Sequence, residues 1–262
     1  MTAASVRPER RKGPASAARQ TWQVSLRYLR ALLRQPAFVV ITLVQPLIWL
    51  LLFGALFKAV TQIPGFASGS YLDYLTPGIV VMLAVSSAGW TGMAFIEDIN
   101  RGVMDRLLVT PAWRGAFNLG SVAQCVLSVV IQTLIIVVLA WILGAHVEHV
   151  GVLIVVAALL AAAFASFSNG LGVLARQRES LIGAVSLLLL PLTFLSGALM
   201  QLSLAPGWIQ NVAKFNPVDW AAVAARSSET GVVLGRVGLL AALVVVASWF
   251  ATRAFAVYQR SL

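Results

Sequence analysis

The chain has 262 residues, of which 60% are hydrophobic and only 11% are charged, and its mean hydropathy is +0.89. Average globular chains carry about 25% charged residues, so this chain has too few to coat a soluble domain of its size. The composition therefore excludes a soluble protein and predicts a polytopic membrane protein. On a soluble chain the net charge of +10 would indicate nucleic-acid binding. Here membrane topology accounts for the charge, and we expect no nucleic-acid partner.

Residues 1–35 are predicted to form a basic cytoplasmic tail followed by an amphipathic connecting helix. The segment carries eight Lys or Arg residues against one acidic residue, Glu9. Apolar residues then recur at helical spacing, with arginines between them, at Trp22, Leu26, Leu29 and Leu33. A helix with one apolar and one basic face is suited to the membrane interface. An ordinary solvated helix packed on a neighbour is the alternative.

Residues 36–262 are predicted to form an all-α transmembrane domain with six spans. The apolar runs are near or above the roughly 20 residues that a spanning helix needs. The predicted spans are residues 37–57, 75–95, 117–143, 150–174, 181–199 and 232–250. Pro46 lies in the middle of the first span and is expected to kink that helix or open it to a neighbour.

The distribution of Lys and Arg predicts that both termini lie in the cytoplasm. With this orientation, 15 basic residues fall in inner segments and 4 fall in outer segments. Such an excess on the inner side is the pattern expected of multi-pass membrane proteins.

A charged stretch at residues 95–115, FIEDINRGVMDRLLVTPAWRG, separates the second span from the third. An unpaired charge at the bilayer centre costs about 2.5–3.5 kcal/mol, so the stretch is predicted to lie at the membrane surface. Leu107 and Leu108 form a short apolar face, Asp105 and Arg106 supply charges, and Pro111 ends the helix. We predict a short helix on which a soluble partner acts. A solvated polar loop is the alternative.

The predicted outer segment between the fifth and sixth spans, residues 200–230, is too long for a turn and too apolar for a solvated loop. Pro206-Gly207 and Asn216-Pro217 divide it into short pieces. We predict short re-entrant helices on the outer side, whose irregular backbone is protected by protein.

These two motifs resemble those of the type-2 permeases of ABC exporters, and most closely the daunorubicin and multidrug-resistance exporter permeases. The resemblance extends over nearly the whole chain. It implies a coupling helix that docks on the ATPase, with the matching residues Glu97, Asp98, Arg101, Gly102, Asp105, Arg106, Leu107, Leu108, Thr110 and Pro111. It also implies an outer re-entrant segment with the matching residues Ser196, Gly197, Pro206, Trp208, Asn216 and Pro217. Met200-Gln201 departs from the pattern of many relatives in that segment.

The same resemblance implies a permease subunit that moves a drug, lipid or lipid-like molecule across the bacterial cytoplasmic membrane. Its expected partners are an ABC ATPase in two copies and a second permease, identical or different. ATP and Mg would bind that ATPase, because this chain has no G-x-x-x-x-G-K-[ST] phosphate loop, and we expect no enzyme activity from it alone. A polysaccharide or lipid-linked glycan is the alternative substrate class.

Other polar residues support no second site at the sequence level. An ion-coupled carrier needs ionisable residues within its spans, and here only Asp73 lies at the edge of one. His146 and His149 are far short of a closed metal-ligand set, so no metal site is predicted. Arg176, Arg178 and Glu179 occupy a short inner turn, where they either set topology or contact the coupling helix or the ATPase.

Overall fold

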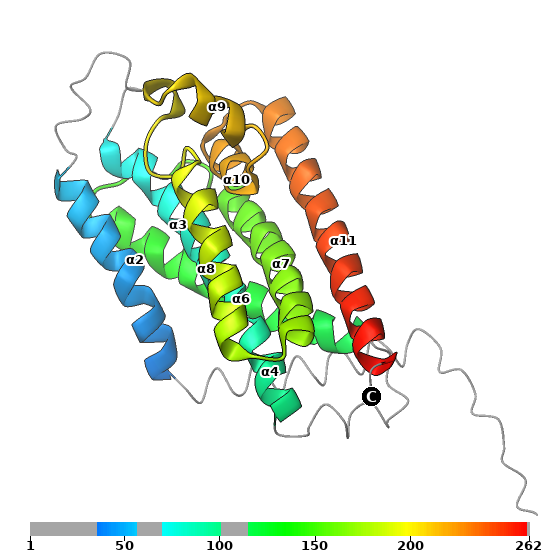
Figure 1. Ribbon diagram of the computed structural model, residues 1–262. Coiled ribbons are helices and arrows are strands. Elements are labelled where there is room, and N and C mark those ends of the chain that lie inside the picture. The colour runs from blue at the N-terminus through cyan, green and yellow to red at the C-terminus, as the bar shows by residue number, and fades with distance from the viewer. Residues whose placement is uncertain (1–35, 57–69, 101–114, 261–262) are drawn as a thin grey trace, which may run out of the picture.

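The computed structural model describes residues 36–56, 70–100 and 115–260, and in these residues the fold is all-helical (Figure 1). The long helices are α2 (Pro36–Leu56), α3 (Tyr71–Gly89), α6 (Gly115–Ile142), α7 (Val150–Ala175), α8 (Arg178–Phe194) and α11 (Thr230–Arg260). The short helices are α4 (Gly92–Asn100), η2 (Leu202–Leu204), α9 (Gly207–Ala213) and α10 (Pro217–Arg226). The predicted tail and connecting helix at residues 1–35 lie outside the described residues.

Within the described residues, four helical stretches are long and apolar enough to cross a membrane. They are Tyr71–Asn100, Asn118–Ile142, Val150–Ala175 and Thr230–Ala256. They lie where the second, third, fourth and sixth spans were predicted. The first and fifth predicted spans are also helical, as α2 with 21 residues and α8 with 17, but neither is among the four. An integral membrane fold is therefore supported, while the number of six spans stays a prediction.

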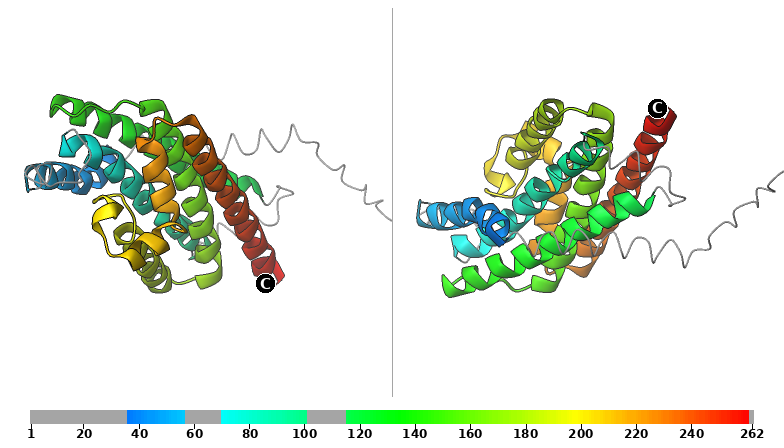
Figure 2. Two further views of the ribbon diagram at one scale, coloured as in Figure 1. Left: turned by 90° about the horizontal axis from the view of Figure 1, so that it is seen from above. Right: turned by 90° about the horizontal axis from the view of Figure 1, so that it is seen from below.

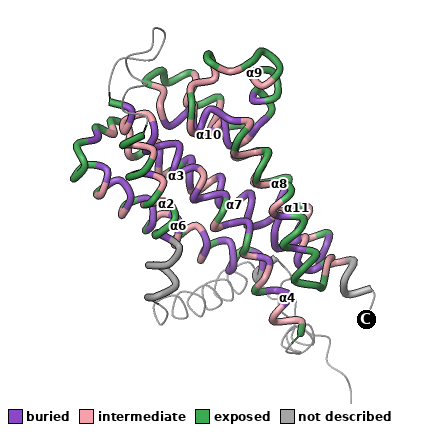
Figure 3. Tube along the Cα trace, turned by 60° about the vertical axis from the view of Figure 1, so that its left-hand side comes forward, coloured by how far each residue is buried: buried purple, intermediate pink, exposed green. Residues whose placement is uncertain are grey.

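Helix α7 lies at the centre of the bundle. It packs against α3, α4, α6, α8, α10 and α11, which surround it when the bundle is viewed end on (Figure 2). Ala157, Ala161 and Ala165 on α7 have no accessible surface. Small side chains of this kind let neighbouring helices approach closely in a membrane protein. Figure 3 shows the resulting buried surface along α7, α3 and α10.

The second predicted span is longer than expected and is interrupted. It begins at Tyr71 and continues to Asn100, whereas the prediction ended it at residue 95. The interruption falls at Trp90 and Thr91, between α3 and α4. Ser168 of α7 explains it, because its hydroxyl group donates to the Gly89 carbonyl and accepts from the Gly92 N–H group at 3.0 Å. The Gly89 carbonyl and the Gly92 N–H group thus form hydrogen bonds with a side chain of α7, a neighbouring helix.

The segment after α8 forms the end of the bundle opposite α4 (Figure 1). Pro206 directly precedes α9, and Asn216 caps α10 by accepting a hydrogen bond from the Val218 N–H group at 2.9 Å. Pro217 follows in the first turn of α10, where a missing N–H group costs nothing. Most residues of α10 are buried, whereas most of α9 is exposed. We call these two ends of the bundle the α4 end and the α10 end.

Candidate functional site

The predicted coupling segment begins on a helix that continues a membrane span. Glu97 and Asp98 lie on α4, which follows α3 after the interruption at Trp90 and Thr91. The remaining predicted coupling residues lie outside the described residues, and these are Arg101, Gly102, Asp105, Arg106, Leu107, Leu108, Thr110 and Pro111. The described part of the segment is therefore an extension of the second span, not a separate surface helix.

An ion pair joins α4 to the first residue of α8, directly after the short turn that follows α7. An Arg178 guanidinium nitrogen lies 3.6 Å from a Glu97 carboxylate oxygen, and both side chains are about half exposed. The sequence left two interpretations for Arg178: it either sets the membrane topology or contacts the coupling helix or the ATPase. The structure shows that Arg178 contacts Glu97, a residue of the predicted coupling segment. Because both groups are exposed, the pair stabilises the fold by only about 0–1 kcal/mol.

Helix α4 approaches the backbone of α7 directly. A Cβ atom added to Gly92 would overlap the Ser168 carbonyl group, and one added to Gly172 would lie 2.5 Å from the Gly92 oxygen. No residue larger than glycine fits either position without a shift of one helix. Because α4 and α7 meet backbone to backbone here, a displacement of α4 is passed to the central helix.

Apolar side chains of α4 also contact two further helices. Phe95 packs edge to face on Phe255 of α11, with ring centroids 5.3 Å apart. Ile96 is fully buried and forms a cluster with Leu181 and Val185 of α8. A nine-residue helix thus contacts α7, α8 and α11 together. The described start of the predicted coupling segment is therefore packed against three long helices.

The α10 end is organised around Arg226, the last residue of α10. The residue keeps some accessible surface, but its guanidinium group lies inside the protein. It donates hydrogen bonds to the carbonyl oxygens of Tyr74 at 2.9 and 3.1 Å, Gly197 at 2.6 Å and Ala198 at 2.7 Å. Burial lowers the pKa of Arg226 from its ordinary value, and interactions with Tyr74 and Asp219 oppose that effect. One side chain therefore joins α3, α10 and the irregular backbone after α8.

Helix α3 supplies the other half of this cluster. The Arg226 guanidinium carbon lies 3.6 Å from the centre of the Tyr74 ring, a cation–π contact. The Tyr74 hydroxyl group donates to the Gly197 carbonyl at 2.7 Å, and the Tyr71 hydroxyl group donates to the Leu199 carbonyl at 3.0 Å. Gly78 makes the close approach possible, because a Cβ atom there would overlap the Ala198 carbonyl group.

The irregular backbone at residues 195–198 is held from α10 as well. Asp219 is buried and accepts a hydrogen bond from the Gly197 N–H group at 3.0 Å. Burial raises the pKa of Asp219 above its ordinary value, while the Gly197 N–H group and two arginines lower it. The Asn216 amide group donates to the carbonyl oxygens of Leu192 at 2.7 Å and Leu195 at 3.0 Å. These contacts satisfy backbone groups that leave the regular helix after α8.

The predicted outer residues divide into two groups in the structure. Ser196, Gly197 and Asn216 are buried, and together with Pro217 they lie next to the Arg226 cluster. Pro206 and Trp208 lie on exposed surface at the start of α9, and Trp208 is 61% exposed. Sequence reasoning missed the central residues, Arg226 and Asp219. Two opposite charges seven residues apart in a short apolar helix indicate that both lie on its buried face, and that spacing could have revealed them.

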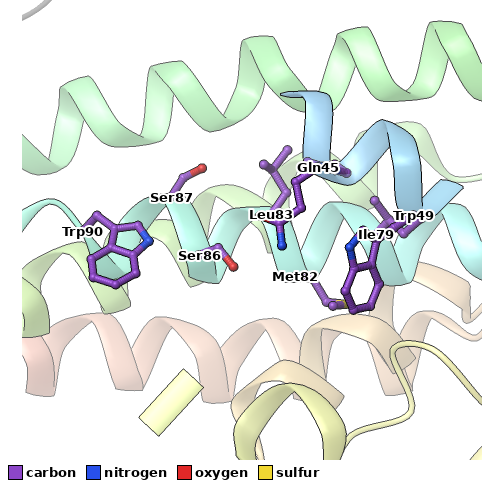
Figure 4. A pocket seen from close by; sticks show the side chains of 9 residues that line it. Gln45, Trp49, Ile79, Met82, Leu83, Ser86, Ser87 and Trp90 are labelled. Carbon is purple, nitrogen blue, oxygen red and sulfur yellow. The ribbon is translucent and has the colours of Figure 1, made fainter. Parts of the chain in front are cut away.

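A cavity of about 280 Å³ lies between α2 and α3 (Figure 4). Figure 4 shows Trp49 and Trp90 at opposite ends of it, with the polar side chains of Gln45, Ser86 and Ser87 between them. Ser87 also donates a hydrogen bond to Gln132 of α6 at 3.2 Å. The remaining lining residues are Pro46, Ile79, Met82 and Leu83. Apolar walls with a few polar groups are typical of sites for small amphipathic ligands.

Four apolar helices of membrane length in the described part of the chain, with a cavity beside one of them, indicate a multi-pass membrane protein. Residues 19–230 match the family described as ABC-2 type transporter. The chain is 32% identical over 230 residues to the daunorubicin resistance ABC transporter permease protein DrrB1 of Streptomyces coeruleorubidus. The matched stretch covers 85% of this chain and 78% of that protein.

Two further similar proteins are putative transport permeases called ycf38. The one from Cyanophora paradoxa is 32% identical over 192 residues, which cover 71% of this chain and 66% of that protein. The one from Porphyra purpurea is 28% identical over 194 residues, which cover 72% and 66%. On the family match and the DrrB1 similarity, the chain belongs to the ABC-2 type transporter family.

Proposed function

We propose that the chain is the membrane subunit of an ATP-driven exporter and moves a lipophilic molecule out of the cytoplasm or out of the inner leaflet. The substrate class is a drug, a lipid or a lipid-like molecule. The working complex contains two ABC ATPase subunits, which bind ATP and Mg, and a second permease that is either identical or related. The membrane is the bacterial cytoplasmic membrane, with both termini and the α4 end on the cytoplasmic side.

One observation carries this proposal: the helix that lines the cavity leads, after an interruption of two residues, into the helix that begins the predicted coupling segment. Residues of α3 from Ile79 to Ser87, together with Trp90, form one wall of the cavity, and α4 starts two residues after Trp90. Movement of the coupling segment therefore changes the end of the cavity at Trp90 through a few residues of backbone. This arrangement supports a direct mechanical link between ATP hydrolysis on the partner and the space available to the substrate.

The lining supports a lipophilic substrate more than a glycan. Two indole rings and four apolar side chains face the cavity, whereas only Gln45, Ser86 and Ser87 offer side-chain hydrogen-bonding groups besides the indole N–H groups. A glycan would leave many of its hydroxyl groups without a partner there, and each such group costs free energy. An amphipathic aromatic molecule places its rings against Trp49 and Trp90 and its few polar groups toward the serines.

The test is transport by the permease reconstituted with its ATPase in inside-out vesicles. The probes are a labelled phospholipid and daunorubicin, the drug that appears in the name of the relative DrrB1. We expect Trp90→Ala to reduce ATP-dependent uptake of the transported probe at least tenfold, because it removes one end of the cavity. Trp141→Ala is the matched control, since Trp141 is 51% exposed on α6 and does not line the cavity. Equal uptake by both variants would refute this cavity as the substrate site.

A further inference from the structure

A second recess in the bundle has no polar lining at all. It has a volume of about 430 Å³ and is lined by residues of α7, α8, α10 and α11. Phe164 and Phe167 of α7 face it, together with Trp249 and Phe250 of α11. The remaining lining residues are Ala163, Leu188, Leu192, Pro217, Leu243, Val246 and Ala247. We call this recess the α7 groove.

The chemistry of the α7 groove differs from that of the cavity between α2 and α3. The α7 groove offers no hydrogen-bond donor or acceptor, so an amphipathic drug or a sugar would lose its hydrogen bonds to water without replacement. A hydrocarbon chain has no such groups to leave unsatisfied. The α7 groove is therefore suited to a ligand whose buried part is pure hydrocarbon.

Phe167 of α7 and Phe250 of α11 narrow the α7 groove, because their rings stack with centroids 5.4 Å apart. A single acyl chain is thin enough to enter such a space.

A cation lies next to the α7 groove toward the α4 end. The Arg253 guanidinium carbon is 5.2 Å from the centre of the Trp249 ring, and Trp249 lines the groove. Arg253 is exposed, and among the described residues no carboxylate pairs with it. Tryptophan next to arginine is an arrangement found at the level of lipid headgroups. A phosphate at this level would neutralise Arg253 while its acyl chain continues into the groove.

We propose that the α7 groove binds one anionic phospholipid of the leaflet at the α4 end. The acyl chain lies on Phe164 and Phe167 between α8 and α11, and the headgroup phosphate contacts Arg253. This lipid is distinct from the transported substrate of the proposed function, because the α7 groove and the cavity between α2 and α3 share no lining residue. It fills the gap between two helices that both contact α4, and so supports the packing through which α4 acts.

The probe is a phosphatidylglycerol with a photoreactive group in the middle of one acyl chain, diluted in phosphatidylcholine vesicles that contain the full-length permease. We expect adducts to concentrate on residues 163–167 and 243–250 and to be competed by unlabelled phosphatidylglycerol. Arg253→Gln should lower the preference for phosphatidylglycerol over phosphatidylcholine about fivefold, the effect of one basic residue near a membrane surface. Arg253 is exposed, so this variant keeps the fold.

A second variant tests the acyl-chain position. Ala247→Phe should remove the adducts by filling the α7 groove, whereas Val138→Phe, on an exposed position of α6 outside the groove, should leave them unchanged. Adducts spread evenly over all exposed helices, with no headgroup preference, would overturn the proposal in favour of ordinary bulk lipid. A disulfide between two copies of Val246→Cys in a Cys125→Ser background would overturn it in favour of a second permease in the groove.

Discussion

The two ends of the bundle are held together in different ways. At the α10 end, the buried guanidinium group of Arg226 donates four hydrogen bonds to three carbonyl groups, and Asp219 and Asn216 fix the same stretch of backbone. At the α4 end, the contacts among the described residues are two hydrogen bonds of Ser168 at the start of α4, a glycine-to-backbone approach, apolar clusters and the exposed ion pair of Glu97 with Arg178. Directional hydrogen bonds to a buried charge permit one geometry, whereas van der Waals contacts allow a helix to slide or rotate.

This difference indicates which end of the protein moves. We expect a partner that pushes on the predicted coupling segment to displace α4, while the α10 end holds α3, α8 and α10 in register. The cavity between α2 and α3 lies between the fixed end and the movable end. On the proposed function, we expect its opening near Trp90 to be the part that changes during transport. The following variants test this contrast, from the largest expected effect to the smallest.

Removal of Arg226 should have the largest effect. Arg226→Met leaves the carbonyl groups of Tyr74, Gly197 and Ala198 without these donors. The Gly197 carbonyl keeps the hydrogen bond from the Tyr74 hydroxyl group. Because each buried group that loses its donor costs about 1–3 kcal/mol, we expect a loss of at least about 2 kcal/mol in stability. The measurement is the midpoint of thermal denaturation in detergent. Lys214→Met is the control, because it removes a positive charge from an exposed position of the same segment. Equal midpoints for both variants would show that the α10 end is not fixed by this cluster.

Replacement of Gly92 by a larger residue should have an intermediate effect, and we expect it mainly on the rate of transport. Gly92→Val forces α4 away from the Ser168 carbonyl group, and overpacking of this kind costs about 1–3 kcal/mol. We expect the complex to assemble and hydrolyse ATP while ATP-dependent uptake falls at least tenfold. Gly183→Val on α8 is the control, because a Cβ atom there meets nothing within 4 Å. If Gly92→Val leaves uptake unchanged, transport does not depend on the close contact between α4 and α7.

The ion pair at the α4 end should have the smallest effect. Glu97→Gln and Arg178→Gln each remove one partner of the 3.6 Å contact, and both partners are exposed. A double-mutant cycle on the uptake rate should give a coupling energy of about 0–1 kcal/mol, which is at most about fivefold in rate. A much larger coupling would show that this pair fixes the α4 end as strongly as Arg226 fixes the other.

The general class of the fold was predictable from the sequence, since it depends on composition and on the length of apolar runs. The interruption at Trp90 was not predictable, because it depends on Ser168, which lies 76 residues further along the chain than Gly92. The burial of Arg226, which falls within the predicted outer segment at residues 200–230, was not predictable either, because it depends on partners at Tyr74 and Gly197. Pro206 and Asn216 mark the starts of the short helices, because caps and prolines act locally.

The predicted coupling helix itself stays a prediction from residue 101 to residue 111, which lie outside the described residues. The structure describes the helix that leads into it and the contacts of Glu97. Leu107 and Leu108 should contribute about 1.5–3 kcal/mol each to docking if they are fully covered by the ATPase. Gly102 should tolerate a side chain poorly if its backbone adopts a positive φ angle.

The most direct test of the central claim is the number of substrate molecules exported per ATP hydrolysed by the reconstituted complex carrying Leu107→Asp. The account predicts that this ratio falls at least tenfold while the permease stays inserted and folded, with a smaller fall for Gly102→Val. Asn100→Asp is the control, because it adds the same charge at an exposed position of α4. Normal export together with normal co-purification of the ATPase in Leu107→Asp would contradict the claim that ATP-driven movement enters through this segment.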